Sequence, residues 1–238
     1  MKARSLILYL YALVVPLLLA PVVVVSFFLG HPGPLFVASK GVVRLARFIL
    51  DARISLIGLE PGLEKKQLIF MANHQSFVDG PLLYWLIPGP VRVILKQEVF
   101  RIPVIGTGMR LMGFIPVDRR GLKGGRRSLD LAGDYMARRG YSYLVFPEGT
   151  RSRDGKLQTM KRGGFFLALR SRVPIVPITI EGTHGLLPRG SFFARRATIR
   201  VTFHPTVPVE GYSKERLPEL IRKVRDSIAS SMTPEEKT

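Results

Sequence analysis

The hydrophobic pattern divides the chain near residue 53. Residues 6–29 form an uninterrupted apolar run without a charged side chain. At about 1.5 Å per residue, a helix of this length crosses a hydrocarbon core of about 30 Å. Pro16 and Pro21 predict a kink or a break, so we expect a membrane-embedded segment rather than a straight span. A cleaved signal peptide is the alternative, although its apolar stretch is usually about 7–15 residues long.

A second helix, amphipathic in pattern, is predicted at 35–53. Lys40, Arg44 and Arg47 recur at helical spacing on one face, while apolar side chains fall elsewhere. This pattern is typical of a helix that lies among acidic lipid headgroups. It is equally typical of a helix that packs on its own domain, and both alternatives stay open. Residues 1–53 are therefore predicted to form a membrane-embedded and interfacial helical segment.

From residue 54 onward the pattern changes to that of an α/β domain. Short apolar or β-branched runs predict strands at 54–59, 67–72, 91–95, 114–117, 142–146, 175–180 and 198–203. Helices are expected at 77–86, 126–139, 164–172 and 213–231. This alternation predicts a mixed, largely parallel sheet flanked by helices, in one domain at 54–238. The polar end, 233–238, is expected to fray.

Composition and charge narrow the classes of partner. The chain has 238 residues, of which 47% are hydrophobic, enough to bury one sizeable core. It has no cysteine, which excludes disulfides, thiolate metal ligands and a cysteinyl acyl-enzyme, and we expect neither a metal nor a cofactor. The 36 Lys and Arg against 17 Asp and Glu leave a net charge of +19, which predicts an anionic partner. Aromatic residues are not interleaved with the basic runs, so an anionic membrane surface is favoured over nucleic acid.

The candidate chemistry lies in Asn73-His74-Gln75-Ser76-Phe77-Val78-Asp79. His74 follows a predicted strand and Asp79 lies in the first turns of the next helix, a junction where α/β folds gather catalytic groups. A neutral imidazole can take a proton from an alcohol, and a carboxylate on its other nitrogen fixes the tautomer. The polar residues of this run also suit helix caps. The other histidines, His31, His184 and His204, are interpreted as structural or exposed.

A second block, Phe146-Pro147-Glu148-Gly149-Thr150-Arg151, ends the strand at 142–146. Pro147 stops the strand ladder and Gly149 permits a tight turn, so the turn exposes backbone amides beside a guanidinium. Glu148 and Arg151 are expected at the same sheet edge as His74. Such a loop suits two-point binding of a phosphate.

With these blocks the chain resembles the glycerolipid acyltransferases, specifically the 1-acyl-glycerol-3-phosphate acyltransferases. The resemblance runs from about residue 67 to residue 188. Two further blocks of that family follow the same order, Gly113-Phe114-Ile115-Pro116-Val117-Asp118-Arg119 and Val173-Pro174-Ile175-Val176-Pro177-Ile178. The resemblance implies an O-acyltransferase that forms phosphatidic acid from a lysophospholipid acceptor. Its acyl donor would be acyl-CoA or acyl carrier protein, and the acyl group would transfer directly.

The resemblance also implies roles for individual residues. His74 would act as general base on the sn-2 hydroxyl, and Asp79 would orient it. The substrate-binding set is Lys96, Arg119, Glu148, Gly149, Thr150 and Arg151. Within it, Arg119, Arg151 and Lys96 would clamp the acceptor phosphate, Glu148 would position the glycerol or the loop itself, and Gly149 and its neighbours would offer amides to the developing oxyanion.

Three expectations concern setting and alternatives. Basic residues on both sides of the apolar run slightly favour a membrane protein whose catalytic domain lies on the cytoplasmic face. Glycerol-3-phosphate or another lysophospholipid remains an alternative acceptor, because pocket shape decides that choice. A protein of a different class, a non-catalytic basic membrane-binding protein, also remains open.

Overall fold

A seven-stranded sheet forms the centre of the molecule in this computed structural model, which describes residues 2–117, 122–187, 190 and 193–237. The strands are β1 (Arg53–Ile57), β2 (Ile69–Ala72), β3 (Arg92–Lys96), β4 (Ile115–Val117), β5 (Tyr143–Val145), β6 (Ile175–Glu181) and β7 (Thr198–Phe203). Their order is β1-β7-β6-β2-β5-β3-β4, and every neighbouring pair is parallel except β6 with β7. The predicted mixed, largely parallel sheet is confirmed.

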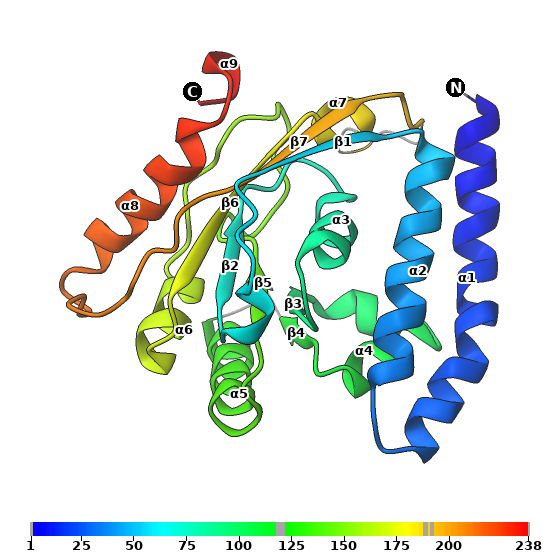
Figure 1. The fold of residues 1–238 in the computed structure, drawn as a ribbon, viewed down its shortest axis with the longest axis horizontal. Helices are drawn as coiled ribbons and strands as arrows, with labels where there is room; N and C mark the ends of the chain where they lie inside the picture. The colour runs from blue at the N-terminus through cyan, green and yellow to red at the C-terminus, as the bar shows by residue number, and fades with distance from the viewer. Residues whose placement is uncertain (1, 118–121, 188–189, 191–192, 238) are drawn as a thin grey trace.

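Helices cover both faces of this sheet (Figure 1). One face packs against α3 (Asp79–Leu86) and α4 (Ile105–Leu111), and the other against α5 (Leu122–Arg139), α6 (Gly163–Ser171) and α8 (Leu217–Ser230). The alternation of side chains along β2 explains this arrangement, since Phe70 and Ala72 enter one core and Ile69 and Met71 enter the other. All four are buried, as expected for a central parallel strand.

The predicted helices of the domain are present with shifted ends, and short ones were missed. The apolar stripe of α8 is buried, as its spacing predicted. The helices without a sequence prediction are α4, α7 (Thr183–Leu186), α9 (Pro234–Lys237) and the 3₁₀ turns η1 (Leu63–Lys65) and η2 (Gln97–Arg101). The expectation of a frayed carboxyl end is wrong for residues 233–237, because α9 folds back and Glu236 bonds to both Gln75 and Leu157. Thr238 lies outside the described residues.

The amino-terminal segment forms a helical hairpin beside the domain (Figure 1). Its first helix, α1 (Lys2–Phe28), continues through Pro16 and Pro21, so of the kink or break that these prolines predicted, the break is wrong. Its second helix, α2 (Gly33–Leu50), returns along α1. Among the described residues, one helical stretch is long and apolar enough to cross a membrane, Ser5–Phe28, with a mean hydropathy of 2.6 and 11% of its most apolar part buried.

Of the two roles that its pattern allowed for the second helix of the hairpin, the contacts of Lys40 bear out packing on the domain. Lys40 does not face the surroundings: its ammonium donates to the carbonyls of Ile87 and Gly89, at 2.9 and 3.0 Å, where α3 has ended. Grouping it with headgroup-facing cations was therefore wrong. Leu45 and Phe48, by contrast, are 51% and 60% exposed on the other side of α2. One face of α2 binds the domain, and another exposes Leu45 and Phe48 together with Arg44.

Candidate active site

Three neighbouring parallel strands bring the candidate residues to one edge of the sheet. β2 lies between β6 and β5 and runs parallel to both, so their carboxyl ends meet. His74 follows β2, Glu148 follows β5 and Thr183 follows β6. Crevices at the carboxyl ends of such strands are where open α/β sheets place ligands. Residues more than 100 positions apart in the chain, such as Gln75 and Thr183, are consequently in contact here.

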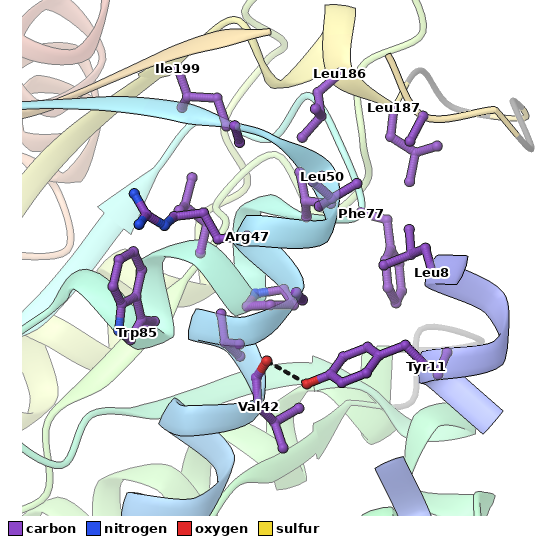
Figure 2. A pocket seen from close by; sticks show the side chains of 18 of the residues that line it. Leu8, Tyr11, Val42, Arg47, Leu50, Phe77, Trp85, Leu186, Leu187 and Ile199 are labelled. Atoms are coloured by element: carbon purple, nitrogen blue, oxygen red, sulfur yellow. Dashed lines mark hydrogen bonds between the residues drawn. The ribbon is translucent and has the colours of Figure 1, made fainter. Parts of the chain in front are cut away.

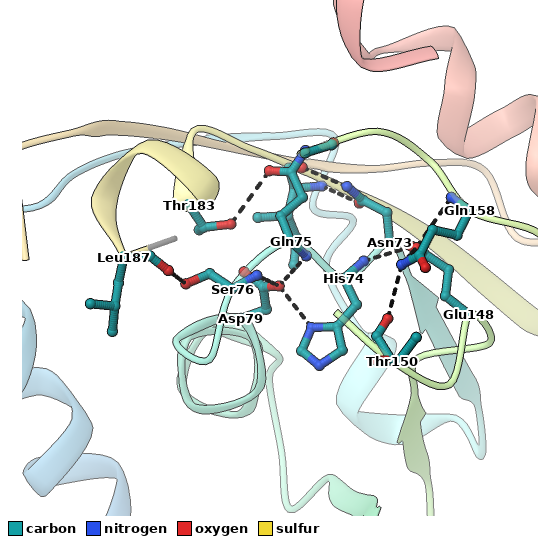
Figure 3. Close-up of polar contacts among 12 residues, drawn as sticks. Asn73, His74, Gln75, Ser76, Asp79, Glu148, Thr150, Gln158, Thr183 and Leu187 are labelled. Atoms are coloured by element: carbon teal, nitrogen blue, oxygen red, sulfur yellow. Dashed lines mark hydrogen bonds and ion pairs between the residues drawn. The ribbon is translucent and has the colours of Figure 1, made fainter. Parts of the chain in front are cut away.

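The geometry of His74 and Asp79 is that of a proton-transfer pair (Figure 3). The His74 Nδ1 atom lies 2.8 Å from Oδ2 of Asp79. Asp79 is fully buried and the His74 side chain is 16% exposed. Its ring stacks on Phe146, with centroids 4.1 Å apart. A carboxylate bound to Nδ1 favours the tautomer with the proton there, which leaves the Nε2 lone pair free to accept a proton.

The Asp79 carboxylate also fixes the loop that carries His74. Its Oδ2 atom accepts hydrogen bonds from the backbone N–H groups of Gln75 and Ser76, each at 2.7 Å. The helix-cap interpretation of these polar residues is wrong, since the N-cap of α3 is Val78 and no side chain caps it. Charge-assisted bonds of this kind hold the carboxylate in place. Asp79 therefore orients the imidazole and the main chain around it at the same time.

Three further contacts fasten the same loop to its surroundings. Asn73 exchanges two hydrogen bonds with the backbone of Ile180, at 2.7 and 2.8 Å, and so continues the pairing of β2 with β6 by a side chain. The Ser76 hydroxyl donates to the carbonyl of Leu187 at 2.7 Å. The His74 carbonyl accepts from the Ser152 N–H at 2.7 Å. The dyad thus stands on a rigid support.

Glu148 belongs to this support and is buried. It is 2% exposed, and its Oε1 atom accepts the backbone N–H of His74 at 2.7 Å. Its Oε2 atom accepts the side-chain and backbone N–H groups of Gln158, at 2.8 and 3.2 Å. Burial raises the pKa of Glu148 to about 7, although these hydrogen bonds oppose the shift. Of the two roles expected for Glu148, its contacts match the positioning of the loop rather than of the glycerol.

The turn after β5 is tight, as the sequence indicated, and the backbone amide of Gly149 already has an acceptor within it. Gly149 has a φ of +73°, a conformation that favours glycine, and its N–H donates to the Phe146 carbonyl at 3.0 Å. That amide is therefore not available to an oxyanion, which corrects the expectation for Gly149. An added Cβ would lie 3.0 Å from the Lys161 ammonium, so Lys161 covers this turn. The Thr150 carbonyl accepts from Gln158 at 3.1 Å.

The expected phosphate-binding cations are placed differently from one another. The Arg151 guanidinium lies over the ring of Phe77, 6.0 Å from its centroid, so it is close to the dyad loop. Lys96 ends β3, two strands from β2, and forms an exposed ion pair with Glu98 at 3.2 Å. Arg119 lies outside the described residues. The structure therefore brings Arg151 to the dyad loop and keeps Lys96 at the same edge of the sheet.

An apolar cavity of about 370 Å³ adjoins the dyad loop (Figure 2). Its walls come from α1, α2 and α3 and from the segments around α7 and β7. Phe77 and Val78, which lie between His74 and Asp79 in the chain, line it, as do Tyr11, Arg47 and Trp85. This volume lies within the range of about 300–1,000 Å³ that is typical of ligand pockets. No sequence pattern predicts this cavity, because it forms only where the hairpin meets the domain.

Each of the other three histidines has a hydrogen-bond partner within the fold. His204 Nε2 lies 2.7 Å from the Thr179 hydroxyl, and burial lowers its pKa. His184 Nε2 lies 3.1 Å from the carbonyl of Arg153, and His31 sits in the turn of the hairpin. Within the described ranges, no group of three or more His, Asp or Glu side chains gathers as a metal site would require.

Comparison with known proteins identifies relatives of the chain. The sequence model of a family described as acyltransferase matches residues 53–181. A 1-acyl-sn-glycerol-3-phosphate acyltransferase of Limnanthes douglasii is 31% identical over 73% of this chain and 62% of the relative. A chloroplastic enzyme of that name from Brassica napus, BAT2, is 38% identical over 69% of this chain and 46% of its own length.

A solved structure agrees with the fold over nearly the whole chain. The crystal structure of the 1-acyl-sn-glycerophosphate (LPA) acyltransferase PlsC from Thermotoga maritima is similar, with a TM-score of 0.81 and 25% identity. The match covers 95% of this chain and 92% of that one, so it includes the helical hairpin. The chain spans about three fifths of the length of the first curated relatives that it matches.

Proposed function

The chain belongs to the acyltransferase family, and from this premise we propose that it transfers an acyl group from a thioester to the sn-2 hydroxyl of 1-acyl-glycerol-3-phosphate, forming phosphatidic acid. The observation that carries this proposal is the buried Asp79 carboxylate bound to Nδ1 of His74, beside an apolar cavity. Such a pair supplies a base for an alcohol, and the cavity offers an environment for an acyl chain.

The proposed reaction needs no protein nucleophile. His74 Nε2 accepts the proton of the acceptor hydroxyl while the hydroxyl oxygen attacks the thioester carbonyl. The carbon–sulfur bond then breaks, and the imidazolium returns the proton to the departing thiolate. Asp79 stabilises the imidazolium between these two steps. Acyl-CoA and acyl carrier protein present the same thioester, so either serves this chemistry.

Charge and shape assign the two ends of the acceptor. Arg151 is proposed to bind its phosphate because a guanidinium forms paired bonds to phosphate oxygens and this one lies over Phe77 of the dyad loop. Lys96 and Arg119 are proposed as further phosphate contacts. The apolar cavity is proposed to hold an acyl chain, since Phe77 lines it as well. Phe77 would thus stand between the charged end and the apolar end of the lipid.

The helical hairpin is proposed to lie in the plane of one leaflet, with the catalytic domain on the cytoplasmic face. The Ser5 hydroxyl, near one end of α1, accepts the Ala194 N–H at 3.1 Å, and near the other end Val23 packs against Gly108 of α4. A helix that touches the domain at both ends cannot cross a bilayer without drawing the domain into it. An in-plane position satisfies these contacts and buries the exposed apolar side chains of α1 and α2.

Release of free thiol from a long-chain acyl-CoA tests the proposed activity in detergent micelles. With lysophosphatidic acid present, the wild-type protein is expected to release thiol and to form phosphatidic acid, and His74→Ala is expected to lose both. His31→Ala is the matched control, because this histidine lies in the hairpin turn. Comparable turnover in His74→Ala and wild type contradicts the proposal, and turnover only with glycerol-3-phosphate or another lysophospholipid assigns the alternative acceptor. Salt-dependent membrane binding without thiol release assigns a non-catalytic role.

Cysteine labelling tests the position of the hairpin, since the chain has no cysteine of its own. His31→Cys in the hairpin turn and Thr233→Cys on the domain are compared in sealed vesicles with a maleimide that does not cross membranes. An in-plane hairpin predicts that both react from the same side. Reaction from opposite sides would show that α1 spans the bilayer.

A further inference from the structure

The carboxyl-terminal turn is docked onto two loops of the candidate active site. The helix α9 follows Met232, which is 3% exposed and anchors the end of α8 in the core. The Glu236 carbonyl then accepts the N–H of Leu157 at 2.9 Å. Its carboxylate Oε1 accepts from the Gln75 amide at 3.0 Å. One residue therefore joins the loop after β5 to the loop that carries the dyad.

Gln75 makes this contact relevant to the chemistry. Its side chain is 1% exposed, and its amide also donates to the Gly155 carbonyl at 2.8 Å. Its backbone N–H is one of the two that bind Oδ2 of Asp79. The side chain of Gln75 is thus fixed from the carboxyl end of the protein, and its main chain fixes the carboxylate that orients His74.

We propose that Glu236 is a positioning residue for the acyl-transfer reaction, which acts through Gln75 on the Asp79–His74 pair. The effect on kcat that follows from this inference rests on the proposed function. The positioning of the dyad loop by Glu236 does not depend on that function. No motif includes Glu236, which lies 161 positions from Gln75. Burial raises the pKa of Glu236, and the nearby Glu181 adds to that shift, while Gln75, Thr233 and His184 oppose it. Burial of the Glu236 carboxyl group is therefore unfavourable in itself. A turn at the surface would not require a buried carboxyl group.

Three variants in the same turn test the proposal. Glu236→Ala removes the acceptor of the Gln75 amide, Glu236→Gln keeps an oxygen there, and Glu235→Ala is the matched control on the exposed side of α9. The free energy of one hydrogen bond corresponds to a change of about fivefold in a rate. We therefore expect kcat to fall about fivefold in Glu236→Ala with little change in KM for the acceptor, since the binding groups are untouched. Glu236→Gln is expected to recover most of this loss, and Glu235→Ala to match the wild type.

A chemical readout keeps the test independent of turnover. Diethyl pyrocarbonate modifies the free imidazole nitrogen, and mass spectrometry gives its rate at His74. A loosened dyad loop predicts faster modification in Glu236→Ala than in Glu235→Ala or Glu236→Gln, at equal thermal midpoints. Equal kcat and equal modification rates in Glu236→Ala and wild type overturn the inference. A wild type without acyl transfer overturns the proposed function instead, and the modification rates then decide the positioning role alone.

Discussion

Asp79→Asn separates the charge of the dyad from its shape. An asparagine can place a carbonyl oxygen where Oδ2 of Asp79 stands, so the N–H groups of Gln75 and Ser76 keep an acceptor. What disappears is the negative charge 2.8 Å from Nδ1 of His74. At an effective dielectric constant of about 20, two unit charges at that distance attract by about 6 kcal/mol. Each 1.36 kcal/mol corresponds to a factor of about ten in rate, so loss of this stabilisation predicts a fall in kcat of about 10⁴-fold as an upper bound.

Initial rates of thiol release at saturating acceptor measure this fall. KM for lysophosphatidic acid is expected to stay within a few fold of the wild type, because Asp79 is fully buried and the substrate does not touch it. Asp134→Asn on the exposed side of α5 controls for the chemical change. A kcat of Asp79→Asn within tenfold of the wild type refutes the argument that the imidazolium depends on this carboxylate.

Three other substitutions test separate parts of the site. The folded-state pKa of Glu148 is raised to about 7. Its contribution to stability is therefore complete below its unfolded pKa and is lost as pH rises through about 7. Calorimetry from pH 5 to 8 should show that the free energy of unfolding declines more in the wild type than in Glu148→Gln, by about 3 kcal/mol. Gly149→Ala should lower the free energy of unfolding by about 1–3 kcal/mol, because alanine is strained at a φ of +73°, whereas Gly125→Ala on α5, whose added Cβ meets open space, should not. Ala46→Phe should fill part of the cavity and slow transfer from long-chain acyl-CoA more than from short-chain acyl-CoA; equal slowing of both would place the acyl chain elsewhere.

The elements that the sequence predicts are those whose signal is local. Strands such as β2 and β5 are continuous apolar runs, and the stripe of α8 recurs at helical spacing. The His74–Asp79 pair could be predicted from the sequence for the same reason, since the two residues are five positions apart and the loop between them is short. The continuous course of α1 through its prolines could not be predicted, because contacts with α2 and with the domain stabilise this helix. Local sequence rules do not include such contacts.

The contacts that support the dyad cannot be read from the sequence because each joins distant parts of the chain, although a role for Glu148 in positioning its loop was among the expectations. Glu148 reaches His74 across 74 positions, Asn73 reaches Ile180 across 107, and Glu236 reaches Gln75 across 161. Polar side chains of these types are common on surfaces, and only the fold shows that these are buried and bonded. Catalytic geometry needs such supports, since a base displaced by about 1 Å loses much of its effect. A motif therefore locates the atoms proposed to react, while the residues that hold them in place must be sought where the carboxyl ends of β6, β2 and β5 meet α9.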